Sequence, residues 1–355
     1  MFPHPASVLC LHRRPRQKMQ AMKRAYYLFN PGRMSRKDNT LKFQPVTEEG
    51  EQKPRYLPVE GISALYIFGS VDANSALYNF LGRKHIPVHF FDYYEHYTGT
   101  FSPREHLLAG QMLVNQTNAY RLSKRRMHLA SGLVEGATFN MLRNLKYYQS
   151  RGREMDDLIS KIEALRPQIG TVKNVPELMG IEGNCRQLYY EAFPRIVPGY
   201  AWEGRKKRPP GNELNALVSF GNSMCYSVCL DAIYNSQLNP TISFLHEPGV
   251  RRYSLALDVS EVFKPLLVDR LLFRMCNKRE LTERDFDLVD DACFLSERGR
   301  KTFVTAWEAR LKDGIQHRKL NRRVTYRHLI RLECYKIAKY VMKMEDSYEP
   351  FHAWW

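Results

Sequence analysis

The feature that most constrains the fold is a change of hydrophobic periodicity at Pro103. Before it, short apolar and aromatic runs such as Ser63–Phe68 alternate with loop residues, as expected for strands. After it, apolar residues recur three and four apart, as in Met155–Leu165, which indicates amphipathic helices. The chain therefore predicts an α+β fold, in which a small N-terminal β-rich domain (residues 22–102) precedes a larger all-helical domain (residues 103–355).

Within the N-terminal part, further strands are expected at Ala25–Asn30 and Thr40–Val46, and Ile86–Phe91 is expected to be the last one. A helix is expected between the second and third of these, after Asp72, which could cap it. Near the other end of the chain, Arg300–Lys343 is rich in basic residues, and we expect it to be helical.

The first 21 residues contain a short apolar patch followed by basic residues, the reverse of a secretory signal. We interpret residues 1–21 as an upstream extension or a disordered tail, outside the fold. No apolar run approaches the ~18 residues that span a bilayer, so no membrane association is expected. The seven cysteines lack zinc-ligand spacing and their odd number fits disulfides poorly, which favours reduced thiols and a cytoplasmic, prokaryotic protein. Cys225 and Cys229, four apart in an apolar stretch, are expected to be buried.

The chain carries a formal net charge of +17, from 54 Lys and Arg against 37 Asp and Glu. Such a surplus favours a polyanionic partner, because neutralised phosphates release counterions, but a basic, solvated surface is an equal alternative. The basic residues expected to contact DNA phosphates are Lys206, Lys207, Arg208, Arg322, Arg323 and Arg327. Contacts of this kind position DNA without reading its sequence.

Two segments carry side chains that could bind a hard cation. Glu182 lies between glycines where we expect a helix to begin, and its alternative role is to complement the helix dipole. His246 follows an apolar run and precedes a Pro-Gly turn, so it could point into a cleft, although a lone histidine is more often structural. Glu247 is a competing ligand, less favoured because it lies closer to the turn.

A third segment, Ser254–Pro265, contains Asp258 and Glu261. If Asp258 opens a helix, these two acids share a face, and each could present oxygen to Mg²⁺ or Mn²⁺. The alternative is a capping box, with Asp258 as the cap and Glu261 at the third helical position. Each of the three segments by itself is weak evidence for a metal site. The evidence is stronger because all three occur in one chain.

In this order, the segments resemble the CRISPR-associated adaptation integrase, the universal spacer-acquisition protein of CRISPR systems, in the form found with the I-B subtype. The likeness covers nearly the whole chain from Met22. The residues that carry it are 26–41 (YYLFNPGRMSRKDNTL), 89–105 (HFFDYYEHYTGTFSPRE), 179–193 (MGIEGNCRQLYYEAF), 208–223 (RPPGNELNALVSFGNS), 244–247 (FLHE), 255–270 (LALDVSEVFKPLLVDR) and 326–339 (YRHLIRLECYKIAK).

The resemblance implies a β-rich N-terminal dimerisation domain, a helical catalytic domain and a homodimer. It also implies a divalent metal, Mg²⁺ or Mn²⁺, held by Glu182, His246 and Glu261. Asp258 would support the site, and it remains an alternative to Glu261 as the third ligand because the family varies there. The implied activity is that of a DNA integrase and endonuclease, which inserts short fragments into a CRISPR repeat array by phosphoryl transfer. Its implied partners are double-stranded and branched DNA and a small ferredoxin-like CRISPR adaptation protein.

Two other functions stay open at this point. A non-catalytic, basic DNA-binding scaffold would bind DNA without regard to a chelator, and an RNA-processing nuclease would prefer RNA. Around the predicted site, either Tyr189 or Tyr190 could face the metal, with core packing as the alternative for both. Asn212 and Asn215 are expected to order the backbone around the site.

Overall fold

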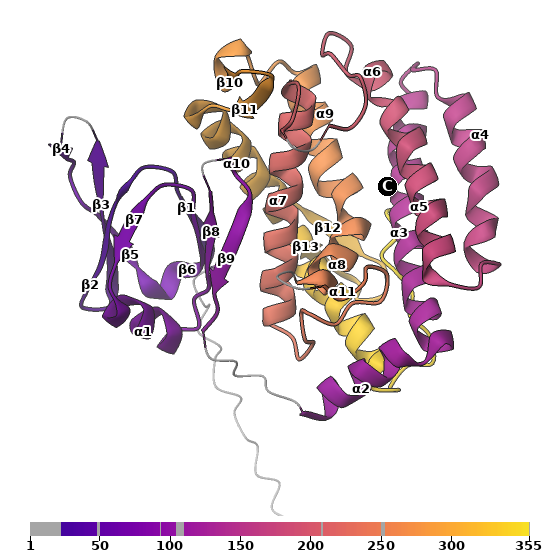
Figure 1. The fold of residues 1–355 in the computed structure, drawn as a ribbon, viewed down its shortest axis with the longest axis horizontal. Helices are drawn as coiled ribbons and strands as arrows, with labels where there is room; N and C mark the ends of the chain where they lie inside the picture. Colours follow the sequence, from indigo (N-terminus) through magenta and orange to yellow (C-terminus); the bar gives the residue numbers. More distant parts are fainter. Residues whose placement is uncertain are drawn as a thin grey trace, which may run out of the picture.

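A smaller β-rich part and a larger helical part lie side by side (Figure 1). The computed structural model describes residues 23–47, 50–92, 94–103, 110–206, 209–249 and 253–354. The predicted α+β arrangement is confirmed. The expectations for residues 1–21, Lys207 and Arg208 lie outside the described residues.

Two sheets form the N-terminal part. The first has the order β1-β6-β8-β9, with β1, β6 and β8 parallel and β9 antiparallel to β8. The second has the order β4-β3-β2-β7, and β5 pairs with β3. The strands are β1 (Arg24–Leu28), β2 (Gly32–Lys37), β3 (Thr40–Thr47), β4 (Gly50–Glu51), β5 (Arg55–Pro58), β6 (Ile62–Ile67), β7 (Val71–Ala73), β8 (Val88–Phe91) and β9 (Tyr97–Phe101), with a 3₁₀ turn at Val59–Gly61.

The predicted strands in this part are confirmed as β1, β3, β6 and β8, and the predicted helix as α1 (Ser75–Arg83). Its cap is Asn74, whose side-chain oxygen accepts a hydrogen bond from the Leu77 N–H at 3.0 Å. The prediction of Asp72 as the cap is wrong, because Asp72 lies in β7. The prediction that Ile86–Phe91 is the last strand is also wrong, since β9 follows it in the same sheet.

Strand β6 is buried on both faces, and its alternate residues contribute to two different cores. Leu65 and Ile67 pack with α1 and with β3 in the core of the small part. Tyr66 faces the other way, as does Phe68 just beyond the strand, whose ring centroid lies 5.7 Å from that of Phe220 in α7 (Glu213–Tyr234). This second aromatic face holds the sheet against the helical part.

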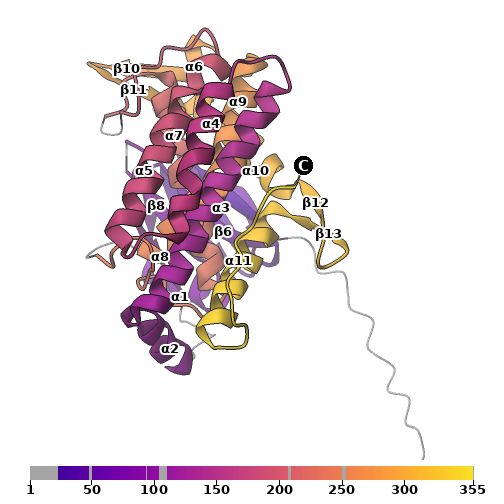
Figure 2. The same cartoon turned by 90° about the vertical axis from the view of Figure 1, so that its right-hand side faces the viewer.

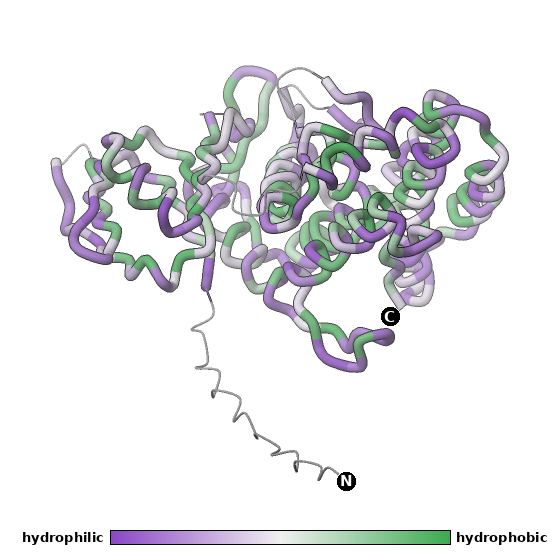
Figure 3. The backbone as a smooth tube through the Cα atoms, turned by 90° about the horizontal axis from the view of Figure 1, so that it is seen from below, coloured by the Kyte–Doolittle hydropathy of each residue, from purple (hydrophilic) through white to green (hydrophobic). Residues whose placement is uncertain are grey.

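The helical part is built around α7 and the long helix α3 (Ser123–Gln149). Figure 2 shows α3, α4 and α5 side by side on its outer surface, and Figure 3 shows its hydrophobic segments gathered toward the interior. The remaining helices are α2 (Gly110–Arg121), α4 (Asp156–Leu165), α5 (Val175–Glu191), α6 (Phe193–Ile196), α8 (Ser254–Lys264), α9 (Arg270–Asn277), α10 (Glu297–Lys312) and α11 (Tyr326–Val341), with 3₁₀ turns at Arg166–Gly170 and Glu283–Asp285 and a π-helical turn at Pro265–Asp269.

Among the described helices, α7 is long and apolar enough to cross a membrane by length and composition, yet 78% of its apolar window is buried in the protein. It is the central core helix of this part. Cys225 and Cys229 lie on it, fully buried as predicted, and the other described cysteines are likewise free and buried.

The sequence predicts that residues 103–355 are all-helical, and this prediction is wrong in two places. Two antiparallel hairpins interrupt the helical part: β10 (Phe286–Val289) with β11 (Ala292–Leu295), and β12 (Gly314–His317) with β13 (Arg322–Thr325). The second hairpin divides the stretch predicted as one helical region, Arg300–Lys343. Thr325 ends the hairpin and caps α11, because its hydroxyl accepts a hydrogen bond from the His328 N–H.

Candidate metal centre

Two carboxylates from different helices meet at one guanidinium. Glu182 projects from α5 and Glu261 from α8, and Arg186 lies between them. The Arg186 Nε–H donates to Glu182 Oε1 at 2.6 Å, and an Nη2–H donates to Glu261 Oε2. All three side chains are largely buried. Two of the three predicted ligands are therefore within the span of a single arginine side chain.

Glu182 does not lie at a helix start, so its alternative role beside the helix dipole is wrong. Helix α5 begins two turns earlier, where the Asn174 side chain accepts a hydrogen bond from the Glu177 N–H at 3.0 Å. The glycines that flank Glu182 have another effect. A Cβ at Gly180 or Gly183 would stand in open space among the described atoms, so this turn of the helix presents little bulk around the carboxylate.

Asp258 is likewise inside a helix, because α8 begins at Ser254, and the capping-box alternative is wrong. Its fully buried carboxylate accepts hydrogen bonds from three backbone N–H groups, those of Phe244 (2.6 Å), Leu245 (3.0 Å) and His246 (2.9 Å). It thereby holds the turn between α7 and α8 in place. Asp258 is thus a support for the site rather than an exposed oxygen donor.

The same carboxylate orients the imidazole of His246. Asp258 Oδ1 accepts from the Nδ1–H of His246 at 2.9 Å, which leaves Nε2 as the nitrogen able to coordinate a cation. Burial opposes protonation of this ring, but the hydrogen bond and the charge of Asp258 outweigh it and raise the pKa of His246 above its ordinary value. Glu247, the competing ligand, instead pairs with Arg126 at 2.6 Å and with the Tyr120 hydroxyl at 2.8 Å.

Glu261 is surrounded by positive charge. Its second oxygen, Oε1, accepts from Lys264 Nζ at 2.6 Å, one turn further along α8. Burial alone would raise the pKa of Glu261, but Arg186 and Lys264 outweigh that effect and lower it to about 2. The carboxylate is therefore ionised at any physiological pH, as a metal ligand must be.

The donor set fits a hard divalent cation. Two carboxylates and one imidazole are suitable ligands for Mg²⁺ or Mn²⁺. In the part of the chain that the structure describes, no three His, Cys, Asp or Glu side chains stand close enough together to hold an ion as they are. The positive charge beside the carboxylates is supplied instead by Arg186 and Lys264.

Glu182 and Arg186 also line a cavity of about 710 Å³ on the outer side of the site. Tyr190 and Trp202 form an aromatic wall of this cavity, with ring centroids 5.6 Å apart. Tyr189 points into the core, where its hydroxyl accepts from Asn144 Nδ2 at 2.8 Å. Of the two tyrosines, Tyr190 is therefore the one on the side of the site.

Asn212 and Asn215 are expected to order the backbone around the site, and they do order backbone beside this cavity. Asn212 caps α7, and Asn215 Oδ1 accepts hydrogen bonds from the Lys206 N–H (2.8 Å) and from Arg205 Nη1 (2.9 Å). The Lys206 side chain is exposed beside this segment. Arg205, which also lines the cavity, thus has its guanidinium held from one side by Asn215.

The remaining basic residues predicted to contact DNA fall into two groups. Arg322 and Arg323 are exposed on β13. Arg327 is not, because its guanidinium donates to Glu308 at 2.8 Å, where the helical part meets the N-terminal sheet. Arg327 is therefore left out of the residues proposed to contact DNA.

Arg186 and Lys264 are the charged residues of the candidate site that sequence reasoning missed. A signal for both was present, since Arg186 follows Glu182 by four residues and Lys264 follows Glu261 by three, which places each cation on the same helix face as its carboxylate. That one arginine would bridge two helices depends on their packing. Both helices pack against α3, where Asn140 Nδ2 donates to the Val262 carbonyl of α8 at 2.9 Å.

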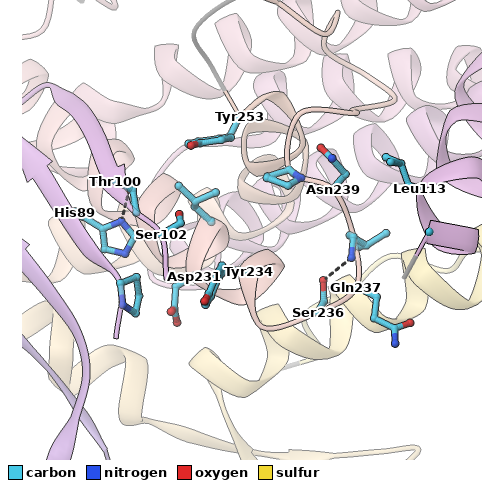
Figure 4. A pocket seen from close by; sticks show the side chains of 15 residues that line it. His89, Thr100, Ser102, Leu113, Asp231, Tyr234, Ser236, Gln237, Asn239 and Tyr253 are labelled. Atoms are coloured by element: carbon cyan, nitrogen blue, oxygen red, sulfur yellow. Dashed lines mark hydrogen bonds between the residues drawn. The ribbon is translucent and has the colours of Figure 1, made fainter. Parts of the chain in front are cut away.

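A second cavity, of about 460 Å³, lies where the two parts of the molecule meet (Figure 4). His89 and Thr100 line it from the sheet, with His89 Nδ1 and Thr100 Oγ1 2.8 Å apart, and Asp231 and Tyr234 line it from α7. None of the predicted site residues borders this cavity. The candidate metal centre is thus separate from it.

A β-rich part joined to a larger helical part, with Glu182 and Glu261 paired to one arginine between two helices, can be compared with known proteins. The family model described as CRISPR associated protein Cas1 matches residues 26–309. The chain belongs to this family.

Particular members are similar over nearly their whole length. The CRISPR-associated endonuclease Cas1 of Fusobacterium nucleatum is 44% identical over 94% of this chain and 98% of that protein. A second such endonuclease, from Moorella thermoacetica, is 47% identical over 94% of this chain and all of that protein. The solved structure of a Cas1 protein from Thermotoga maritima superposes with a TM-score of 0.82 at 36% identity, covering 92% of this chain and all of that one.

Proposed function

We propose that this chain is a divalent-metal-dependent DNA integrase and endonuclease, which inserts short DNA fragments into a CRISPR repeat array. The observation that carries the proposal is the meeting of Glu182 and Glu261 at one guanidinium, beside an imidazole whose tautomer is set by Asp258. Membership of the Cas1 family supports it, as do the names of the relatives, which are CRISPR-associated endonucleases.

Glu182, His246 and Glu261 would hold Mg²⁺ or Mn²⁺, which when bound polarises the scissile phosphate and stabilises the extra negative charge of the transition state. The chain's own residues prepare the site. Asp258 keeps the proton of His246 on Nδ1, and Arg186 and Lys264 keep the Glu261 carboxylate ionised. A 3′-hydroxyl would be the nucleophile in integration, and water in cleavage.

The proposed partners are double-stranded and branched DNA, a second copy of the chain and a small ferredoxin-like CRISPR adaptation protein. The excess of positive charge and the exposed Arg322 and Arg323 support a DNA partner. Solved complexes with similar folds support a protein partner, since one is titled a Cas6-RT-Cas1–Cas2 complex. The buried, free cysteines fit a protein of the reducing cytoplasm.

The test is strand transfer of a short duplex into a plasmid that carries CRISPR repeats, with Mn²⁺ or Mg²⁺. Glu182→Gln, His246→Ala and Glu261→Gln should each lower the rate by roughly 10²–10³-fold. Glu247→Gln is the matched control, because this neighbour of His246 faces Arg126 and Tyr120 and should keep the wild-type rate. Wild-type rates in all three site variants would refute the proposal.

The second candidate, a non-catalytic DNA-binding scaffold, is favoured only by the net charge of +17. It predicts salt-sensitive DNA binding that a chelator does not change, and no product strands. The same assay separates the two functions, because a scaffold gives no strand transfer with either metal. Cleavage of RNA in preference to DNA would instead indicate an RNA-processing nuclease.

A further inference from the structure

The feature that the proposed function does not explain is the arginine inside the site. Of the four carboxylate oxygens of Glu182 and Glu261, three accept a hydrogen bond from a cationic side chain: Glu182 Oε1 and Glu261 Oε2 from Arg186, and Glu261 Oε1 from Lys264. A divalent cation needs these same oxygens. It would also place two positive charges next to the guanidinium of Arg186, which is already buried between the two carboxylates, and the like charges would repel each other.

We propose that Arg186 is an exchangeable counter-ion of the metal centre: it holds Glu182 and Glu261 together before the metal arrives, and the metal must displace it. The inference rests on the proposed function, because it assumes that these two carboxylates are the ligands. Arg186 is a positioning residue in this scheme, since it acts through the carboxylates and not on the reacting atoms.

Two features of the structure support exchange rather than a permanent ion pair. Arg186 is the cation shared by both carboxylates, so its departure frees an oxygen on each helix at once. Its side chain also lines the cavity of about 710 Å³, which offers room for a displaced guanidinium.

Competition of this kind has a measurable consequence. If only molecules whose carboxylates are free of Arg186 bind metal, the apparent Kd equals the intrinsic Kd divided by the fraction of such molecules. Removing the arginine brings that fraction close to one and tightens binding. A merely structural arginine, which keeps the ligands in place for the metal, has the opposite effect when it is removed.

The experiment is calorimetric titration of the full-length protein with MnCl₂, in parallel with thermal unfolding with and without Mn²⁺. We expect Arg186→Gln to bind Mn²⁺ about tenfold more tightly than the wild type, which corresponds to ~1.4 kcal/mol. Without metal this variant should unfold at a lower Tm, because two buried carboxylates then repel each other. Its rise in Tm on adding Mn²⁺ should be larger than that of the wild type.

Two further variants keep the test decisive. Arg186→Lys retains the charge and can reach Glu182 one turn away, but it lacks the fork that spans both helices, so its Kd should lie between those of the wild type and Arg186→Gln. The matched control is Arg195→Gln, which removes the same charge from an exposed pair with Asp157 and should leave the Kd unchanged.

Equal or weaker Mn²⁺ binding by Arg186→Gln and Arg186→Lys overturns the inference. Glu182→Gln separates this result from a failure of the proposed function. If Glu182→Gln weakens Mn²⁺ binding at least tenfold while the arginine variants do not tighten it, the metal centre stands and the exchange is refuted. If Glu182→Gln binds Mn²⁺ as the wild type does, the metal centre itself is wrong, and the inference falls with it.

Discussion

Two of the buried charge clusters in the described part of the chain are organised differently. In the interface cluster, at the boundary between the sheet and the helical part, Glu308 accepts hydrogen bonds from the Tyr27 hydroxyl at 2.6 Å and from Arg327 at 2.8 Å. The Tyr66 ring stacks on that of Tyr27, with centroids 4.7 Å apart. Here a single carboxylate has an arginine and a hydroxyl of its own and is covered by aromatic rings.

In the candidate metal centre, two carboxylates share one arginine beside a cavity, and Lys264 pairs with Glu261 alone. Buried ion pairs by themselves contribute little evidence of function, since the desolvation cost offsets much of the attraction. The proposed difference between the two clusters is whether the cation can be exchanged. The interface cluster joins two parts of the fold, whereas the carboxylates of the candidate metal centre are proposed to exchange Arg186 for a divalent cation.

The largest effect on stability is expected at Asp258, which supports the metal centre. Asp258→Ala leaves three backbone N–H groups and the His246 ring without their common acceptor, inside a largely buried turn. We expect a loss of about 3–5 kcal/mol in the free energy of unfolding, measured by urea denaturation. Asp258→Asn keeps one acceptor oxygen and should lose about half as much. Equal stability of Asp258→Ala and wild type would contradict the supporting role.

The interface cluster should respond in stability but not in chemistry. Glu308→Gln keeps the shape of the side chain but removes the charge that Arg327 pairs with, and we expect a loss of about 2–3 kcal/mol. At a temperature where the variant is fully folded, its strand-transfer rate should stay within about twofold of the wild type. A loss of activity as large as that of Glu182→Gln would abolish the distinction between the clusters.

Another ion pair between the sheet and the helical part should make the free energy of unfolding depend on pH. Glu95, next to β9, pairs with Arg300 of α10 at 2.9 Å. Burial raises the pKa of Glu95 from 4.5 to about 7, although Arg300 opposes the shift. The folded state therefore holds this proton more tightly, so its contribution is complete below pH 4.5 and is lost as the pH rises toward 7.

The measurement is urea denaturation at pH 5 and pH 8. We expect the wild type to lose of the order of 1–2 kcal/mol more over this interval than Glu95→Gln, which cannot titrate there. The difference between the two proteins isolates Glu95 from the other groups that titrate. Parallel losses in both would show that Glu95 is ionised throughout and belongs with the permanent pairs of the interface cluster.

How much of this could be predicted from the sequence depends on the range of the interactions. Local periodicity predicts β3, β6 and α1, because the apolar pattern of a strand or helix can be recognised from residues close together in the sequence. It missed β9, whose Gly99 and polar residues do not alternate clearly with apolar ones. It also missed the hairpin β12–β13, whose residues read as part of a long basic helix.

The site shows the same limit. Glu182, His246 and Glu261 could be grouped only through the resemblance, because nothing local predicts that α5 and α8 meet across α3. The placement of Glu182 and Asp258 at helix starts is wrong, since α5 begins at Val175 behind the Asn174 cap and α8 begins at Ser254 without a side-chain cap. Sharing of Arg186 by two helices is a tertiary property and has no sequence signature of its own.

The smallest effect is expected on DNA affinity, when exposed arginines are replaced. It tests which of the neighbouring arginines contact DNA and which belong to the interface cluster. Arg322 and Arg323 are exposed on β13, while Arg327, only a few residues along the chain, is committed to Glu308. Each phosphate contact contributes about 0.9 to the slope of log K against log salt concentration for duplex DNA. Replacing Arg322 and Arg323 together by Gln should therefore lower that slope by up to about 1.8 and leave the Tm unchanged.

Arg327→Gln should do the reverse, lowering the Tm while the slope stays that of the wild type, because the charge of Arg327 already neutralises the carboxylate of Glu308. A reduced slope in Arg327→Gln would mean that this arginine leaves Glu308 for DNA, and the interface cluster would then be exchangeable, as is proposed for the candidate metal centre.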